Sequence, residues 1–397
     1  MSVLSKPEVP SWIPARETEL IQDSEYLDLE VVDISSLIAD PLTTSTAARD
    51  TIDRAFRSLQ ETGFVILTGH GFSSEALGRQ FDLGNMFLEV SEEVKHQYHA
   101  KIWEEGSWAG YKPLGFYNRK NGARDTIESH DFYPYTVVNE LQPPVSWPYL
   151  DEIRSFYKVN LGDASKSSTF KPSYVCSKPT LFYCAQYCQL SREDLGFPQI
   201  EYFSFWQLHH RACEKADEIQ TRDLFRAVKY HPPSEEDRLR SEQLWLPPHT
   251  DRGSITFLYS QPVAGLQVFM NHSWKYVRYY PGGIIVNLGD AMDFTTGGLL
   301  KAALHRVYEP PADQRHLPRL GLFYFATMLP DIPMQPLEPL TARARPPVEG
   351  TFDEFEGKIP TAHEWQIKRA KSTGRPADGV LFAKRFPKQD SAVYSKT

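Results

Sequence analysis

Residues 254–287 read SITFLYSQPVAGLQVFMNHSWKYVRYYPGGIIVN and hold four short apolar or aromatic runs separated by turn residues. The runs lie at 254–260, 265–270, 275–280 and 283–287. Short strands that recur roughly every ten residues with turn signals between them are typical of a barrel or a two-sheet jelly roll. Two further runs, at 224–230 and 320–327, extend the predicted β region to about residues 224–330.

The N-terminal half reads as mixed helix and strand. Residues 27–37 alternate as a strand does, residues 49–60 repeat apolar side chains at helical spacing, and residues 63–67 form a short buried strand. Ser73 or Ser74 can cap a helix that runs to about residue 88, and Ser91 can open another. With an amphipathic helix at 361–371, these elements predict an α+β fold whose mainly β core is wrapped by helices.

The chain divides into four predicted regions. Residues 27–150 form an N-terminal α/β region, 151–223 a helical and irregular connection, 224–330 the β core, and 331–397 a C-terminal extension with one helix. The N-terminal region and the β core are expected to share one hydrophobic core.

No element can be assigned between residues 159 and 190, which are rich in Ser, Lys, Gly and Pro without a clear period. This stretch is a disordered insertion, a surface excursion or an error in the gene sequence, and it is expected to be dispensable for a metal site. Nearby Cys184, Cys188, His209, His210 and Cys213 allow a zinc site. The spacing lacks paired CxxC knuckles, so buried or incidental cysteines are the favoured interpretation.

The composition argues against several classes of protein. The net charge of −8 gives no electrostatic reason to expect nucleic acid as a partner. No apolar run approaches the roughly 18–20 residues that a membrane helix needs. The first nineteen residues carry three prolines and no apolar segment, which is unlike a secretory signal. A cytoplasmic protein with a small-molecule substrate is therefore expected.

The chemically informative stretch is Pro247-Pro248-His249-Thr250-Asp251-Arg252-Gly253. On a strand, alternate residues point to the same face, so the imidazole of His249 and the carboxylate of Asp251 are expected side by side. A third ligand must come from another strand, and His305 is the best candidate. The intervening chain is long enough to return to the opposite sheet.

Two histidines and one carboxylate on one face leave open positions on Fe(II), as in non-haem iron oxygenases. Zinc is the weaker choice because four ligands satisfy it and because it prefers more nitrogen or sulfur. A bare HxD pattern also arises by chance, and a lone histidine is more often a surface or core residue. The β-rich context and the later histidine favour the metal site.

Several ordered motifs resemble the isopenicillin N synthase-like group of 2-oxoglutarate/Fe(II)-dependent dioxygenases. In the N-terminal half they are Val32-Asp33, residues 63–71 (GFVILTGHG) and residues 91–95 (SEEVK). In the core they are residues 230–233 (YHPP), 249–251 (HTD), 265–268 (GLQV), 286–290 (VNLGD), 296–298 (TGG) and 305–307 (HRV). The similarity spans about residues 27–330 apart from the irregular stretch, and it implies a distorted double-stranded β-helix, or jelly roll.

The resemblance also implies the site residues. The iron ligands are His249, Asp251 and His305, with no catalytic residue beyond them. Arg319, at the start of a late strand, corresponds to an arginine that pairs with the far carboxylate of 2-oxoglutarate. Arginine suits this role because its planar fork meets a carboxylate through two parallel hydrogen bonds.

Two positions depart from the family pattern. Gly321 replaces a serine whose hydroxyl would also bind the carboxylate. His231 stands where the family often has a tyrosine that touches the same group, and it is a candidate donor in that place. Restoring the serine is expected to tighten 2-oxoglutarate binding or leave it unchanged.

The implied activity is oxidation of a small organic substrate, with Fe(II) as metal and 2-oxoglutarate and O2 as co-substrates, releasing succinate and CO2. Hydroxylation, desaturation and radical rearrangement are all compatible outcomes, in specialised metabolism. One alternative is an iron oxygenase that does not use 2-oxoglutarate, favoured by Gly321 and His231 and opposed by Arg319. The other is a non-catalytic binding module, opposed by the intact triad. The sequence indicates neither the substrate nor the oligomeric state.

Overall fold

The computed structural model describes residues 8–39, 45–133 except 118, 142–153, 223–337 and 352–372, together with Lys6, Phe156 and Ala344. The irregular stretch at 159–190 and the cysteine-containing zinc alternative lie outside these residues. Among the helices of the described part, none is long and apolar enough to cross a membrane.

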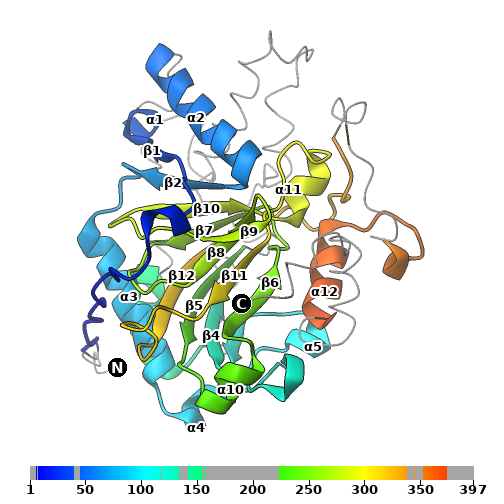
Figure 1. Ribbon diagram of the computed structural model, residues 1–397. Helices are drawn as coiled ribbons and strands as arrows, with labels where there is room; N and C mark the ends of the chain where they lie inside the picture. The colour runs from blue at the N-terminus through cyan, green and yellow to red at the C-terminus, as the bar shows by residue number, and fades with distance from the viewer. Residues whose placement is uncertain are drawn as a thin grey trace.

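Two antiparallel sheets form the centre of the molecule (Figure 1). All strand pairs in the larger sheet are antiparallel except β1 with β2. Its order is β1 (Val31–Asp33), β2 (Phe64–Thr68), β10 (Ile284–Leu288), β7 (Ile255–Tyr259), β12 (Arg319–Ala326), β5 (Leu224–Tyr230), β4 (Ile127–Phe132) and β3 (Gly110–Lys112).

The smaller sheet faces the larger one and has the order β6 (Leu244–His249), β11 (His305–Tyr308), β8 (Leu266–Met270) and β9 (Ser273–Tyr276). Apolar side chains such as Leu258, Leu266 and Val268 pack together between the two sheets. The predicted double-stranded β-helix is therefore confirmed. Because β1 to β4 belong to the same sheet as the core strands, the N-terminal half contributes directly to this core.

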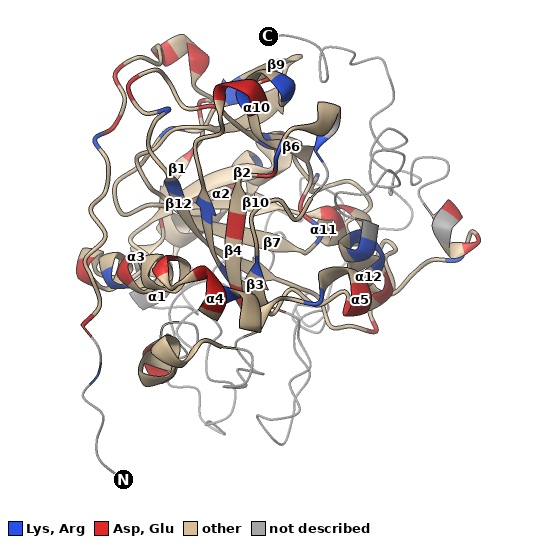
Figure 2. Ribbon diagram, turned by 90° about the horizontal axis from the view of Figure 1, so that it is seen from below, with Lys and Arg blue, Asp and Glu red and all other residues tan. Residues whose placement is uncertain are grey.

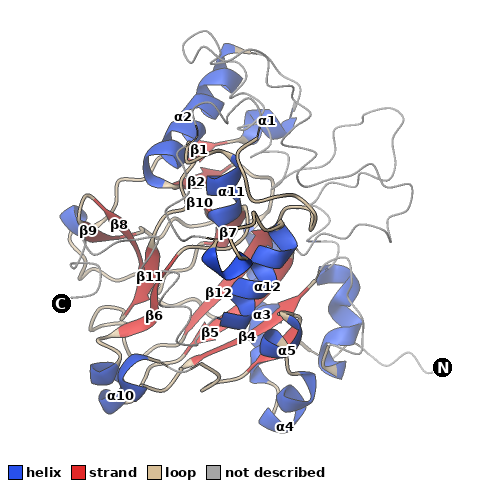
Figure 3. Cartoon of the chain, turned by 90° about the vertical axis from the view of Figure 1, so that its right-hand side faces the viewer, coloured by secondary structure: helices blue, strands red, loops and turns tan. Residues whose placement is uncertain are grey.

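Helices cover the outer face of the larger sheet and its ends (Figure 3). Helix α3 (Ser74–Glu89) lies against β5 and β12 so closely that a Cβ on its Gly84 would come within 2.7 Å of Leu322. Helix α2 (Thr46–Thr62) packs on β1 and β2, and α12 (Ala362–Ser372) packs on α5 (Ile102–Glu105). The shorter helices are α1 (Ser35–Ala39), α4 (Glu92–Lys95), α10 (Glu235–Arg240) and α11 (Asp290–Thr295).

Local signals placed most predicted elements correctly. Ser73 accepts a hydrogen bond from the amide of Ala76 and caps α3, as expected. The strand predicted at 27–37 is wrong in length, because β1 covers three residues and the Asp33 carboxylate then accepts the amide of Ser35 as α1 begins. The run at 275–280 is shifted, since β9 ends at Tyr276. Strands β3 and β4 were not predicted at all.

Candidate metal centre and its cavity

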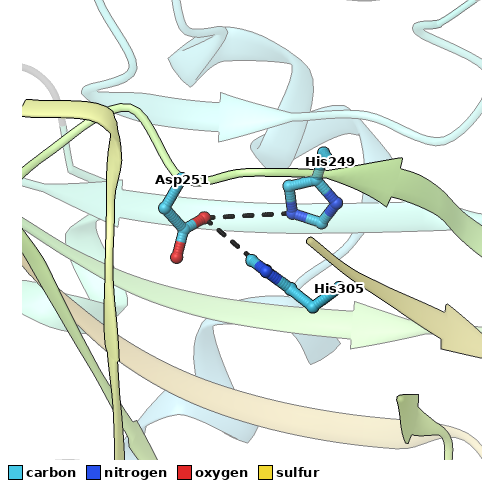
Figure 4. A group of neighbouring side chains, drawn as sticks. All are labelled: His249, Asp251 and His305. Atoms are coloured by element: carbon cyan, nitrogen blue, oxygen red, sulfur yellow. Dashed lines mark ion pairs between the residues drawn. The ribbon is translucent and has the colours of Figure 1, made fainter. Parts of the chain in front are cut away.

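The two histidines of the predicted triad face each other across neighbouring strands. His249 is the last residue of β6, His305 is the first of β11, and the two are register partners. Asp251 lies two residues beyond the end of β6. Figure 4 shows its carboxylate pointing at both rings, with Oδ1 3.8 Å from Nε2 of His249 and 3.8 Å from Nε2 of His305. One ligand atom from each residue falls within 4.8 Å of the others.

This arrangement differs from the expected one in two respects. Asp251 was expected on the same strand as His249, but it lies beyond the end of β6. His305 comes from the adjacent strand of the same small sheet, and the prediction that it returns from the opposite sheet is wrong. The convergence of the three side chains is as predicted. Cross-strand pairing alone brings the imidazoles together, because residues directly opposite each other project to the same face.

Backbone carbonyls orient both imidazoles. Nδ1 of His249 lies 2.9 Å from the carbonyl of Pro247, and Nδ1 of His305 lies 3.0 Å from that of Ala303. A ring that donates its Nδ1 proton to a carbonyl presents the lone pair of Nε2, which is the form that binds metal. Burial and the neighbouring His305 lower the pKa of His249 to about 3, so this ring is neutral at physiological pH.

Hydrogen bonds also hold the Asp251 carboxylate. Its Oδ2 accepts from the hydroxyl of Thr256 at 2.6 Å and from the side-chain amide of Asn287 at 2.8 Å. Burial alone would raise the pKa of Asp251, but the two histidines and these donors lower it below its ordinary value. The carboxylate is therefore ionised, with Oδ1 directed at the histidines and Oδ2 satisfied by protein.

The triad lines a cavity of about 770 Å³ between the two sheets. Pockets of this size hold a drug-sized ligand. Arg319, the first residue of β12, also lines it and is only 4% exposed. Its Nε donates to the carbonyl of Val263 at 3.2 Å, whereas its Nη1 is buried and has no hydrogen-bond partner among the described residues. Burial lowers the pKa of the Arg319 guanidinium. The surrounding protein groups therefore stabilise its positive charge only in part.

The aromatic neighbour of Arg319 is Tyr230, and the expectation for His231 is wrong. Tyr230 is the register partner of Arg319 on β5, so its ring lies on the cavity face, 5.5 Å from the guanidinium. His231 follows it and points the other way, where its Nε2 lies 2.7 Å from Glu128. A one-residue step reverses the face of a strand, so the motif match alone could not distinguish the two positions.

Gly321 leaves no open space for a side chain. A Cβ at this position would come within 2.8 Å of the Phe323 ring and 3.2 Å of Val228. Phe323 and Val228 both line the cavity. The ring of Phe323 therefore occupies the space in which a serine side chain would stand, which argues against tighter 2-oxoglutarate binding by a serine at this position.

The aromatic residues contributed by residues 103–133 fall into two groups. Trp108, Tyr117 and Tyr133 line the cavity. Phe132 is instead fully buried in the core on the other face of β4, and Trp103 stacks on Phe116 with ring centroids 4.3 Å apart. His70 makes a structural contact, because its Nε2 lies 2.6 Å from the carbonyl of Gly282.

Four residues of this site were not assigned a role from the sequence. Thr256 and Asn287 hold Asp251, Tyr230 lies beside Arg319, and Arg226 lines the cavity. A signal was present for two of them. Asn287 is a polar residue inside the apolar run of β10, and Arg226 interrupts the apolar run of β5. Thr256 carries no comparable signal, because threonine is common in strands.

Two families match the chain. Residues 222–327 match the 2OG-Fe(II) oxygenase superfamily, and residues 29–149 match the family described as non-haem dioxygenase in morphine synthesis N-terminal. These matches cover the described β core and most of the N-terminal half.

The chain is also similar to individual proteins over most of its length. The chain is 26% identical over 354 residues to UPF0676 protein C1494.01 of Schizosaccharomyces pombe, covering 85% of this chain and 92% of the relative. It is 25% identical over 282 residues to gibberellin 20 oxidase 4 of Arabidopsis thaliana, covering 70% of this chain and 66% of that oxidase. The crystal structure of a full-length Neurospora crassa protein in complex with alpha-KG superposes with a TM-score of 0.64 at 17% identity, covering 88% of this chain and 98% of that protein.

Proposed function

We propose that this chain, which belongs to the 2OG-Fe(II) oxygenase superfamily, holds iron through His249, Asp251 and His305 and oxidises a small organic substrate in the adjoining cavity. The chain is a 2-oxoglutarate-dependent non-haem iron dioxygenase. One observation carries the assignment of the site. Three potential ligand atoms converge on the wall of a cavity that also contains a buried, incompletely paired arginine.

The donor set fits Fe(II). Two imidazoles and one carboxylate are the protein ligands of the facial triad, which leaves further positions on the metal open. Because Thr256 and Asn287 hold Oδ2, Asp251 is set to bind through Oδ1 alone. Single-oxygen coordination keeps one more position free for co-substrate and O2.

Arg319 fits the far carboxylate of 2-oxoglutarate. Its unpaired Nη1 is a buried donor that a carboxylate oxygen can satisfy, and the ring of Tyr230 forms one wall beside it. A buried charge without a partner is costly, so an anionic ligand stabilises this part of the cavity. His231 is turned toward Glu128 and Gly321 has no side chain, so more of the binding depends on Arg319.

With iron and 2-oxoglutarate bound, the centre supplies the oxidising equivalent from O2 as 2-oxoglutarate is converted to succinate and CO2. The chain's own residues position the partners and keep water out. Leu246, Leu258 and Val307 line the cavity with aliphatic surface. A substrate that packs against these aliphatic side chains presents a C–H bond to the metal.

The similarity to a gibberellin 20 oxidase supports a substrate from specialised metabolism. Which of hydroxylation, desaturation or rearrangement takes place depends on that substrate. The cytoplasmic location expected from the sequence stays a prediction.

The test is succinate formation by the purified chain supplied with Fe(II), 2-oxoglutarate and O2. His249→Ala and Asp251→Ala should abolish it and lose bound iron while the thermal unfolding curve stays near that of the wild type. His272→Ala, at an exposed turn, is the matched control and should behave as the wild type. Activity like that of the wild type in either ligand variant would remove the assignment.

A further inference from the structure

The cavity wall is strongly basic apart from the metal ligands. Among the described residues that line it, Asp251 is the only acid, whereas six side chains are basic. The six are Lys112, Arg119, Arg226, Arg252, Arg319 and Arg369. Figure 2 shows basic and acidic segments next to each other on β3 and β4, inside the body of the molecule. A cavity wall that carries mostly basic side chains favours an anionic ligand and disfavours a cationic one.

One basic group lies too far from Arg319 to share its ligand. Arg226 and Tyr230 face the cavity from the same strand, and Tyr230 is the register partner of Arg319. Four residues of strand at about 3.3 Å each place Arg226 about 13 Å along β5 from Tyr230. A five-carbon diacid that is bound at Arg319 and at the metal does not extend to that end. Arg226 therefore belongs to a different part of the cavity.

Arg226 is held rigidly beside an aromatic wall. Its Nε donates to Asp131 at 2.9 and 3.0 Å, and its Nη2 donates to the same carboxylate at 2.5 Å. The guanidinium carbon lies 4.5 Å from the ring centroid of Trp108, and that of Arg252 lies 5.1 Å from the same ring. Two guanidinium groups therefore lie near one indole at this end of the cavity.

Tyr117 adds a hydrogen-bond donor to the same place. Its hydroxyl oxygen is buried and has no hydrogen-bond partner in the described part of the chain. Burial raises the pKa of Tyr117 far above its ordinary value, although Arg252 and Arg226 act in the opposite direction. The hydroxyl keeps its proton at neutral pH and can donate to an acceptor in the cavity. Buried hydroxyl groups are normally satisfied, so a ligand group is the expected partner.

Among the described residues, two acids pair with three of the basic groups at this end. Asp125 pairs with both Lys112 and Arg119, and Asp131 pairs with Arg226. Burial, together with Arg119 and Arg226, lowers the pKa of Lys112 to about 8, although Asp125 acts in the opposite direction. The carboxylates stabilise the basic groups in place without cancelling them.

We propose that Arg226, Arg252 and Tyr117 form an anion subsite that binds a carboxylate of the primary substrate. The apolar body of that substrate lies against Trp108 and Phe325 and extends toward the iron. Phe325 lines the cavity, and its ring centroid is 5.3 Å from the Arg226 guanidinium. This inference rests on the proposed function, because it assigns the substrate class of the same cavity. The enzyme is thus an oxygenase for organic acids.

The test compares acids with their neutral derivatives. The probes are a panel of aromatic and fused-ring monocarboxylic acids, each paired with its methyl ester, added to the anaerobic Fe(II) enzyme with 2-oxoglutarate. Affinity is read from the thermal shift across a concentration series. At least one acid should bind tenfold or more tightly than its ester, and the same acid should stimulate succinate release once O2 is admitted.

Substitutions in the proposed subsite then show where the carboxylate of the substrate binds. Tyr117→Phe removes only the hydroxyl and should reduce the acid-to-ester preference severalfold. Arg252→Gln should reduce it further, with bound iron measured because Asp251 is adjacent. Arg57→Gln, on the exposed face of α2, is the matched control and should keep the full preference. If Arg252→Gln fails to fold, Tyr117→Phe alone decides.

Two results would overturn the subsite. The first is a wild-type enzyme that binds no acid of the panel more tightly than its ester. The second is an acid preference that survives unchanged in both variants. Failure of the proposed function looks different, because acid selectivity would then persist in the thermal shift while neither 2-oxoglutarate binding nor succinate release is detected.

Discussion

Two buried charges, Glu128 and Arg319, lie one row apart in the large sheet but on opposite faces of it. Glu128, 2% exposed, accepts hydrogen bonds from Lys95 at 2.9 Å and Tyr111 at 2.7 Å, and His231 lies 2.7 Å from its other oxygen. Arg319, 4% exposed, has one backbone carbonyl and a nitrogen without a partner among the described residues.

This difference distinguishes a buried charge that the protein itself stabilises from a buried charge that a ligand is expected to pair with. Burial alone would raise the pKa of Glu128, yet its three partners lower it to about 2, so the protein stabilises the ionised form. For Arg319 burial lowers the pKa and only Tyr230 opposes it. A buried charge that the fold itself does not satisfy is the stronger indication of a binding role.

Removing Glu128 should have the largest effect on stability. Glu128→Ala leaves the ammonium of Lys95 buried without its main partner, which costs about 3–5 kcal/mol of unfolding free energy. Urea denaturation measures the loss. Glu92→Ala removes the exposed partner of the same lysine and should change stability by less than about 1 kcal/mol. Equal effects for the two variants would show that the Glu128 cluster is not a structural network.

The acid dependence of stability should follow from the same residue. The pKa of Glu128 falls from its ordinary value of 4.5 to about 2 on folding. Its contribution is therefore complete above about pH 4.5 and is lost as the pH falls toward 2. The stability difference between wild type and Glu128→Gln should shrink over this range in denaturation curves. A difference that stays constant from pH 5 to pH 3 would contradict the assignment.

Gly321→Ser should have the smallest effect, and it should not tighten 2-oxoglutarate binding. The new side chain meets Phe323, so we expect a stability loss of about 1 kcal/mol and no gain in 2-oxoglutarate affinity. The double variant Gly321→Ser with Phe323→Leu provides space and should recover the loss. Tighter 2-oxoglutarate binding by the single variant would show that Phe323 moves aside freely.

Local sequence patterns predicted much of the fold because they act over a few residues. The apolar run of β5 and the serine cap of α3 were both predicted at their observed places. The pairing of β6 with β11 was not, since it depends on which distant segments meet. The sequence motifs identified the three residues of the triad. Only the structure shows that its two histidines come from neighbouring strands of one sheet.

The cofactor end of the cavity shows the same limit at the level of single residues. Arg319 was predicted from the family resemblance, as the arginine at the start of a late strand. Choosing Tyr230 over His231 as its neighbour needs the register of β5 against β12. Likewise, the serine-to-glycine change at 321 could be read from the sequence, but the ring of Phe323 over that position could not.

The most direct measurement is titration of 2-oxoglutarate into the anaerobic Fe(II) enzyme, for wild type, Arg319→Ala and the volume-conserving Arg319→Met. We expect both variants to bind 2-oxoglutarate at least tenfold more weakly, a loss of about 1.4 kcal/mol of binding free energy. Arg319→Met should unfold at or above the wild-type temperature without ligand, because it removes an incompletely paired buried charge. Equal 2-oxoglutarate affinity in wild type and both variants would show that the anchor is elsewhere and would contradict the account.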